Sequence, residues 1–196
     1  MNLLFIDCCI SQRGEGSRTA ALCRAFLDTW RAQNPQGRVE TAALAGLGLK
    51  PFDVDMLNRR EALFHARRFD DPVYSLARQF AAADRILVGA PFWDLSFPAA
   101  LRIYIEHISA NGVTYHYDDQ GPHGDCQAEK LAFLTSGGDF EQPNSSGVEY
   151  WRQLCGMYGI PRYDFVFAGG LDAAPEKAEA FLAEACAKAR RLAEDW

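Results

Sequence analysis

Short apolar runs recur along the chain, and polar or amphipathic stretches separate them. Apolar runs of this length are typical of strands that are covered on both faces, as in a parallel sheet, and one run that alternates is also typical of a strand. We therefore predict five strands, at Leu3 to Ile6, Arg38 to Leu44, Ile86 to Ala90, Lys130 to Ser136 and Arg162 to Ala168.

Between these strands, apolar residues recur three and four positions apart, which is the period of a helix with one buried face. The pattern predicts helices after Ser17, within Leu57 to Arg68, after Pro72, from Phe97 to Ile108, from Gly147 to Tyr158 and after Pro175. Alternating strands and helices indicate a single three-layer α/β domain over residues 1–196, with helices on both faces of a parallel sheet. We favour the flavodoxin-like strand order 2-1-3-4-5 over a dinucleotide-binding order.

The composition of the chain argues against two classes of binding partner. The chain has 196 residues and a formal net charge of -6, which argues against nucleic acid or an anionic membrane as a partner, because those surfaces need clustered Lys and Arg. No apolar stretch has the length of a membrane span, and Met1 to Asp7 lacks the basic start and cleavage site of a signal peptide. We therefore expect a cytoplasmic protein.

The six cysteines form no CxxC pair, which argues against a zinc cage and a secreted disulfide framework. Cys8 and Cys9 are adjacent at a strand end, and a redox role for them stays open because Arg13 and Arg18 are near in sequence. The segment from His116 to Cys126 is dense in metal-type ligands, but its spacing matches no standard zinc pattern, and we expect no metal.

The loop after the first strand offers the hydroxyls of Ser11, Ser17 and Thr19 at the start of a helix. Hydroxyls and free N–H groups at a helix start are phosphate-binding parts, although an ordinary capped helix has the same pattern. The loop contains neither a Walker motif nor a GxGxxG. A phosphate monoester is therefore favoured over a triphosphate or a nicotinamide dinucleotide.

The loops after the third and fourth strands emerge at the same edge of such a sheet. Phe92 and Trp93 could lie against a planar ring, although they would also suit a plug over the core. Gly137 and Gly138 allow a close approach of backbone to a ligand. A planar heterocycle with one phosphate fits all three loops, and FMN is the candidate.

Four segments resemble the FMN-dependent NADH-azoreductase family, the bacterial relatives of the DT-diaphorase quinone reductases. They are the loop from Ser11 to Thr19, the run from Pro91 to Ile105, the run from Gly112 to Pro122, and Leu134 to Gly138 together with Phe165 to Gly170.

The resemblance implies three sets of FMN contacts. The phosphate would be held by Ser11, Ser17, Arg18 and Thr19, the isoalloxazine would be lined by Pro91, Phe92, Trp93, Asp94 and Leu95, and its far side would meet Ser136, Gly137, Gly138 and Asp139. It also implies a homodimer with each flavin near the subunit boundary. Tyr117, or Tyr115 if the register shifts, would close the substrate pocket.

The implied activity is two-electron reduction of quinones or azo compounds with NADH or NADPH, by ping-pong kinetics. The flavin N5 would carry the hydride, so no catalytic side chain is expected. The alternative is a flavodoxin-like electron carrier that works with protein partners, which the net acidity would suit. The long insert at residues 112–127 instead suggests a pocket wall.

Asp94 departs from the family pattern, in which Asn is usual. A carboxylate only accepts hydrogen bonds, whereas an amide also donates. We expect either that Asp94 accepts from the flavin N3–H or that its side chain points away from the ring.

Overall fold

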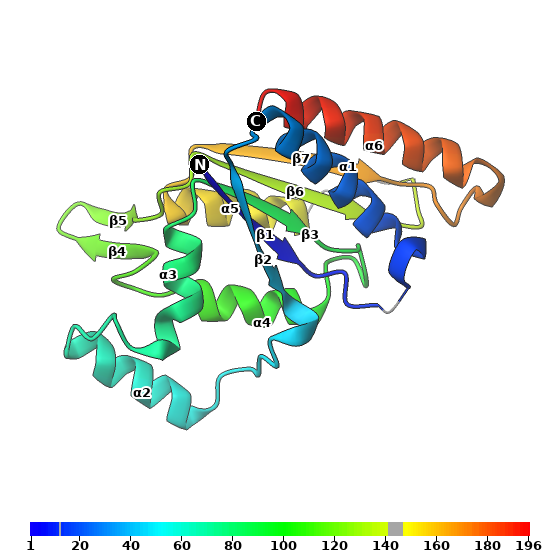
Figure 1. The fold of residues 1–196 in the computed structure, drawn as a ribbon. Helices are drawn as coiled ribbons and strands as arrows, with labels where there is room; N and C mark the ends of the chain where they lie inside the picture. The colour runs from blue at the N-terminus through cyan, green and yellow to red at the C-terminus, as the bar shows by residue number, and fades with distance from the viewer. Residues whose placement is uncertain (12, 141–146) are drawn as a thin grey trace.

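The computed structural model describes residues 1–11, 13–140 and 147–196. A parallel sheet lies between two layers of helices (Figure 1). Its strands are β1 (Asn2–Asp7), β2 (Arg38–Ala43), β3 (Arg85–Gly89), β6 (Lys130–Ser136) and β7 (Arg162–Ala168). The predicted flavodoxin-like α/β fold with five parallel strands is confirmed.

The order along the sheet is β2-β1-β3-β6-β7. It differs from the predicted 2-1-3-4-5 because two further strands, β4 (Tyr115–Asp118) and β5 (Gly121–Gly124), precede the last two strands of the sheet in the chain. These two strands pair with each other, antiparallel, in a separate sheet.

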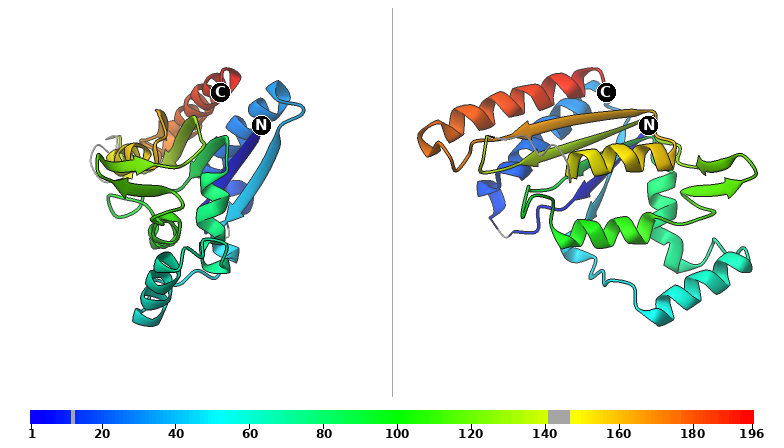
Figure 2. Two further views of the ribbon diagram at one scale, coloured as in Figure 1. Left: turned by 90° about the vertical axis from the view of Figure 1, so that its left-hand side faces the viewer. Right: turned by 180° about the vertical axis from the view of Figure 1, so that it is seen from behind.

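Helices cover both faces of the parallel sheet (Figure 2). On one face α1 (Arg18–Gln33) packs against α6 (Ala178–Glu194). The other face carries α3 (Ser75–Ala81), α4 (Ala99–Ile108) and α5 (Gly147–Tyr158). Short 3-10 turns lie at Gly14–Gly16, Leu44–Gly46, Pro72–Tyr74 and Pro175–Lys177.

Burial on both faces explains the unbroken apolar runs. In β1, Leu4 and Ile6 belong to the core beneath α4 and α5, whereas Leu3 and Phe5 belong to the core beneath α1 and α6. Each such side chain contributes about 1.5–3 kcal/mol when it is fully buried. Alternate residues of the strands therefore hold both helix layers onto the sheet.

The insert at residues 112–127, which contains β4 and β5, was expected to form a pocket wall, but it lies at the opposite end of the sheet from the loops after β1 and β3. Helix α4 runs back along the sheet, so it delivers the chain at Ile108 to the amino-terminal ends of the strands (Figure 1). The hairpin then packs on the last turn of α5, where a Cβ at Gly124 would lie 2.0 Å from the backbone N of Gly159.

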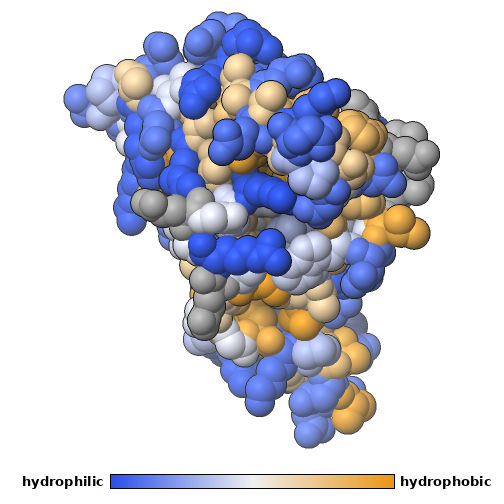
Figure 3. Space-filling view, turned by 90° about the vertical axis from the view of Figure 1, so that its right-hand side faces the viewer, coloured by the Kyte–Doolittle hydropathy of each residue, from blue (hydrophilic) through white to orange (hydrophobic). Residues whose placement is uncertain are grey.

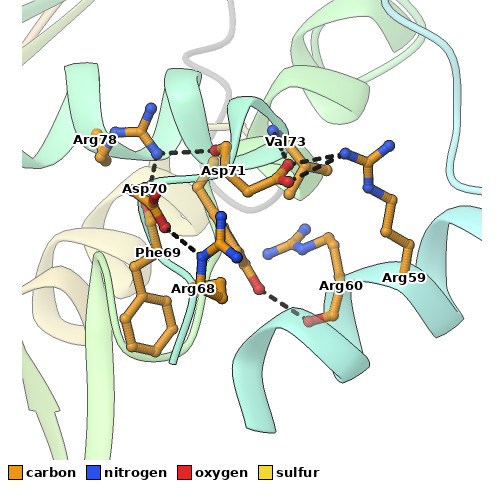
Figure 4. A network of polar contacts seen from close by, with 9 residues as sticks. Arg59, Arg60, Arg68, Phe69, Asp70, Asp71, Val73 and Arg78 are labelled. Carbon is orange, nitrogen blue, oxygen red and sulfur yellow. Dashed lines mark hydrogen bonds and ion pairs between the residues drawn. The ribbon is translucent and has the colours of Figure 1, made fainter. Parts of the chain in front are cut away.

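Helix α2 (Val54–His65) stands at the margin of the molecule and has no fully buried side chain. Its predicted start, Leu57, was late because the Asp53 carboxylate caps the helix by accepting from the Met56 N–H at 2.8 Å. At its surface, Arg59 contacts the loop that follows the helix, and its Nη2 lies 3.1 Å from both carboxylate oxygens of Asp71 (Figure 4).

Candidate functional site

The loops after β1, β3, β6 and β7 meet at one edge of the sheet. The strand ends are in register, with Asp7 beside Gly89 and Ser136 beside Ala168. Between the loops lies a hollow of about 180 Å³. Its lining residues are Cys9, Ser11, Arg13, Ser17, Arg18, Thr19, Pro91, Phe92, Trp93, Ser136, Gly137, Gly138, Leu171 and Asp172.

The start of α1 supplies one wall of the hollow. Ser17 caps the helix, and its Oγ accepts from the Ala20 N–H at 3.3 Å. The N–H groups of Arg18 and Thr19 have no acceptor among the described residues. Helix starts favour anions because such N–H groups and the helix dipole carry partial positive charge. This wall can therefore accept a phosphate.

Two buried hydroxyls connect this wall to the loop after β6. The Oγ1 of Thr19 and the Oγ of Ser136 lie 2.6 Å apart. Both side chains are shielded from solvent, yet both residues line the hollow. Each hydroxyl keeps hydrogen-bonding capacity beyond this one contact.

Strand β3 leads into a tight aromatic turn. The Phe92 N–H donates to the Ser136 carbonyl at 2.9 Å, while Trp93 and Ser96 exchange backbone hydrogen bonds of 3.1 and 2.8 Å. Asp94 and Leu95 form the two-residue turn between them, with φ of 50° and 63°. Positive φ at both central positions is the pattern of a type I′ turn. Figure 3 looks onto this edge, where hydrophilic and hydrophobic residues both reach the surface.

Gly137 and Gly138 keep the opposite side open. A Cβ at Gly137 would lie 3.1 Å from the Phe167 ring, and a Cβ at Gly138 would lie 2.6 Å from Oδ2 of Asp172. A side chain at Gly137 would also press on Phe92, whose Cδ1 would lie 3.4 Å from that Cβ and whose ring centroid is 6.4 Å from that of Phe167.

Ten of the predicted cofactor residues line the hollow, whereas Asp94, Leu95 and Asp139 do not. Gln12, within the first loop, lies outside the described residues. Four further residues line the hollow that were not among the predicted contacts, namely Cys9, Arg13, Leu171 and Asp172. Leu171 and Asp172 follow β7. They could have been predicted from the sequence, because the loop after each further parallel strand emerges at the same edge of the sheet.

Tyr117 does not line this hollow. Together with Phe64, Arg67 and His116 it lines a second hollow of about 580 Å³ between the end of α2 and the β4–β5 hairpin. Its side chain is 64% exposed, and the hairpin is at the end of the sheet away from the aromatic turn (Figure 1). Tyr117 therefore does not close the hollow of its own chain.

The hairpin histidines pair with carboxylates. His116 Nδ1 lies 2.9 Å from Asp125, and His123 Nε2 lies 2.8 Å from Asp118. Across the described part of the chain, no group of three or more His, Cys, Asp or Glu side chains is arranged to hold a metal ion.

Burial suppresses the ionisation of Cys8. Desolvation, together with smaller effects of the neighbouring Cys9 and Asp7, raises the pKa of this thiol to about 12. Cys9 lines the hollow, whereas Cys8 lies in the core. Burial therefore argues against the redox role that was left open for Cys8 on account of the nearby Arg13 and Arg18.

Comparison with known proteins agrees with this architecture. The family model of the flavodoxin-like fold Flavodoxin_2 matches residues 1–193. An FMN-dependent NADH:quinone oxidoreductase of Clostridium acetobutylicum is 32% identical over 92% of both chains, and one of Clostridium perfringens is 30% identical over 97% of both. The crystal structure of an azoreductase from Bacillus anthracis superposes with a TM-score of 0.89, at 25% identity over 100% of both chains. This chain therefore belongs to the flavodoxin-like family that includes FMN-dependent NADH:quinone oxidoreductases and azoreductases.

Proposed function

We propose that the chain binds FMN in the hollow at the carboxyl ends of the strands and reduces quinones or azo compounds with NADH or NADPH. The observation that carries the proposal is the convergence of an anion-accepting helix start, an aromatic turn and a glycine pair around one hollow. The names of the relatives, which are FMN-dependent NADH:quinone oxidoreductases and azoreductases, support it.

The donors in the hollow fit a phosphate monoester. Two N–H groups at the start of α1 have no acceptor among the described residues, and Ser11 and Ser17 lie beside them in the lining. Three or more such donors are typical of phosphate sites. Ser11, Ser17, Arg18 and Thr19 would therefore hold the phosphate, as the family resemblance implies.

The remaining walls fit a flat ring system. Pro91, Phe92 and Trp93 would lie along one side, with Ser136, Gly137 and Gly138 opposite. Asp94, Leu95 and Asp139 would contribute backbone contacts at the rim, since their side chains are exposed and lie outside the lining. When bound, FMN supplies a ring that takes a hydride at N5 from the nicotinamide and passes two electrons to the acceptor.

The test begins with the purified chain. We expect a yellow protein, or a colourless one that takes up added FMN, and the released cofactor should be identified by mass spectrometry. NADH should then be consumed steadily with a quinone in the absence of any partner protein, giving parallel lines in initial-rate plots. A chain that neither holds nor takes up FMN would refute the proposal. FMN binding with turnover only in the presence of a protein partner would favour the electron carrier.

We also propose a homodimer in which Tyr117 acts on the partner's flavin. Tyr117 and the aromatic turn lie at different ends of the sheet, so a Tyr117 that closes a substrate pocket must come from a second copy. Sedimentation should give twice the mass of 21.8 kDa. Tyr117→Ala should raise the KM for a quinone and leave the Kd for FMN unchanged. A monomer that is fully active would contradict both parts.

We infer that residues 1–196 form one domain that acts in the cytoplasm. The family model spans residues 1–193, and all six cysteines are free thiols, which suits a reducing compartment. Among the described residues, no helix is long and apolar enough to cross a bilayer. Fractionation of cells that express the chain would test the location.

A further inference from the structure

An ion pair joins the first and last loops of the hollow. Oδ1 of Asp172 lies 2.6 Å from Nη1 of Arg18, and both residues line the hollow. Arg18 is the first residue of α1, whereas Asp172 follows β7. The pair therefore places a carboxylate beside the donors that would hold a phosphate.

Asp172 also contacts the loop after β6, through its backbone and its carboxylate. The Asp172 N–H donates to the Gly138 carbonyl at 3.0 Å. Oδ2 of the same residue packs on Gly138 so closely that a Cβ there would lie 2.6 Å away. Glycine at position 138 thus provides the space that the carboxylate occupies.

The charges around the hollow make this carboxylate distinctive. Arg13 and Arg18 are the basic side chains of the lining, and Asp172 is its one carboxylate among the described residues. A helix start already favours an anion. Before any ligand binds, Asp172 therefore compensates part of the positive charge that would attract a phosphate.

We propose that Asp172 is an internal counter-ion that competes with the FMN phosphate for Arg18 and so sets the affinity for the phosphate end of the cofactor. This inference rests on the proposed function, because it takes the hollow to be the FMN site. A phosphate monoester carries a charge of about -1.5 to -2 near neutral pH, so it repels the carboxylate and must share or displace its contact with Arg18. The pair is partly exposed, so water and salt keep the effect moderate.

The experiment distinguishes an effect of Asp172 on the phosphate of FMN from an effect on its ring. Asp172→Asn keeps the shape of the side chain and removes its charge. The Kd values of FMN and of riboflavin, which has the same ring without the phosphate, are measured for both proteins at one ionic strength. We expect FMN to bind about fivefold more tightly to Asp172→Asn, with riboflavin unchanged. The control Glu176→Gln, an exposed acid nearby in the chain, should change neither constant.

The same substitution in a protein that lacks the Arg18 charge tests whether the effect of Asp172 on FMN affinity depends on Arg18. In Arg18→Met, the gain from Asp172→Asn should fall to about twofold, because only direct repulsion between carboxylate and phosphate remains. Asp172→Ser should give the same direction of change as Asp172→Asn, and it serves as the variant if the amide impairs folding.

Three results would overturn the inference. Weaker FMN binding by Asp172→Asn would mean that the carboxylate holds Arg18 in place for the phosphate. An equal gain in affinity for FMN and riboflavin would mean that the Asp172 carboxylate acts on the ring. No change in either Kd would mean that the carboxylate does not compete with the phosphate. A wild-type chain that binds neither flavin would refute the proposed function as well, so the two failures are distinct.

Discussion

The hydroxyl oxygens of Thr19 and Ser136 lie 2.6 Å apart, although the two residues are 117 positions apart in the chain. Thr19 belongs to the first turn of α1, and Ser136 is the last residue of β6. Their contact fixes the start of the helix against the glycine loop. The geometry of the hollow therefore depends on a hydrogen bond between two of the loops that form it.

Replacing Thr19 by Val should destabilise the protein by about 1–2 kcal/mol, because the change keeps the shape of the side chain but leaves the buried Ser136 hydroxyl without this partner. Denaturant unfolding measures this change in the free energy of unfolding. In a cycle with Ser136→Ala, we expect a coupling of about 1 kcal/mol. Strictly additive single changes would show that the contact contributes nothing to stability.

Replacing Leu95 by Gly should stabilise the ligand-free protein by about 1 kcal/mol. Leu95 has a φ of 63°, where a Cβ costs about 1–2 kcal/mol, and glycine removes this cost at the expense of some entropy. The side chain is 77% exposed, so little packing is lost. Leu95→Ala keeps the Cβ and should leave the melting temperature unchanged. A lower melting temperature for Leu95→Gly would contradict the assigned strain.

Replacing Asp94 by Asn should leave both the FMN affinity and the flavin reduction potential unchanged. The Asp94 side chain is exposed and lies outside the hollow, which corresponds to the expectation that only its backbone reaches the flavin. Asn also tolerates the φ of 50° that the turn requires. A potential that rises in the variant would show that the carboxylate faces the ring.

The sequence predicted the layers and the edge of the sheet at which the hollow lies, because both follow from local patterns. Unbroken apolar runs reveal doubly buried strands, Ser17 marks the start of a helix, and Gly137 directly follows the end of a strand. The place of the β4–β5 hairpin depended instead on the direction in which α4 returns along the sheet. In a parallel sheet each crossover helix returns the chain to the amino-terminal ends of the strands, so this direction was implied by the predicted fold, and it places Tyr117 away from the predicted pocket.

Asp172 was not among the predicted contacts. Its importance comes from contacts with Arg18 and Gly138, which are distant in sequence, and an isolated Asp after a strand has no pattern of its own. The turn at Asp94 and Leu95 was likewise hidden, because neither residue is glycine although both have positive φ.

Replacing Arg60 by Lys should loosen α2. The Arg60 guanidinium donates to the carbonyls of Glu106 at 3.1 Å and Ser109 at 2.8 Å, and it lies 4.8 Å from the centroid of the Phe52 ring. A lysine ammonium cannot reproduce the planar, two-pronged donor geometry with which the guanidinium reaches both carbonyls. We expect amide hydrogen exchange within α2 to become about tenfold faster, which corresponds to about 1.4 kcal/mol of local stability.

The neighbouring variant Arg59→Lys is the matched control. Arg59 contacts both oxygens of Asp71, but its side chain is 61% exposed, and exposed ion pairs contribute little. Exchange within α2 should change less than threefold in this variant. Equal effects of the two substitutions would show that Arg60 has no special role in holding the helix.

Three thiols with raised pKa values should make the protein less stable in alkaline solution. Burial raises the pKa values of Cys8, Cys126 and Cys155 from 9.0 to about 12. Below pH 9 these thiols are protonated in both the folded and the unfolded chain. Between pH 9 and 12 the unfolded chain releases protons that the folded chain retains, so stability falls as the pH rises.

The slope should reach about 1 kcal/mol per pH unit for each thiol. Denaturant unfolding at pH 8, 9, 10 and 11 measures it, with a reductant present to prevent oxidation. Cys155→Ala should be less stable at pH 8, because it leaves a cavity, and should show a shallower decline, because one titrating group is gone. A free energy of unfolding that stays constant from pH 8 to 11 would show that these thiols ionise as readily in the folded chain as in the unfolded one.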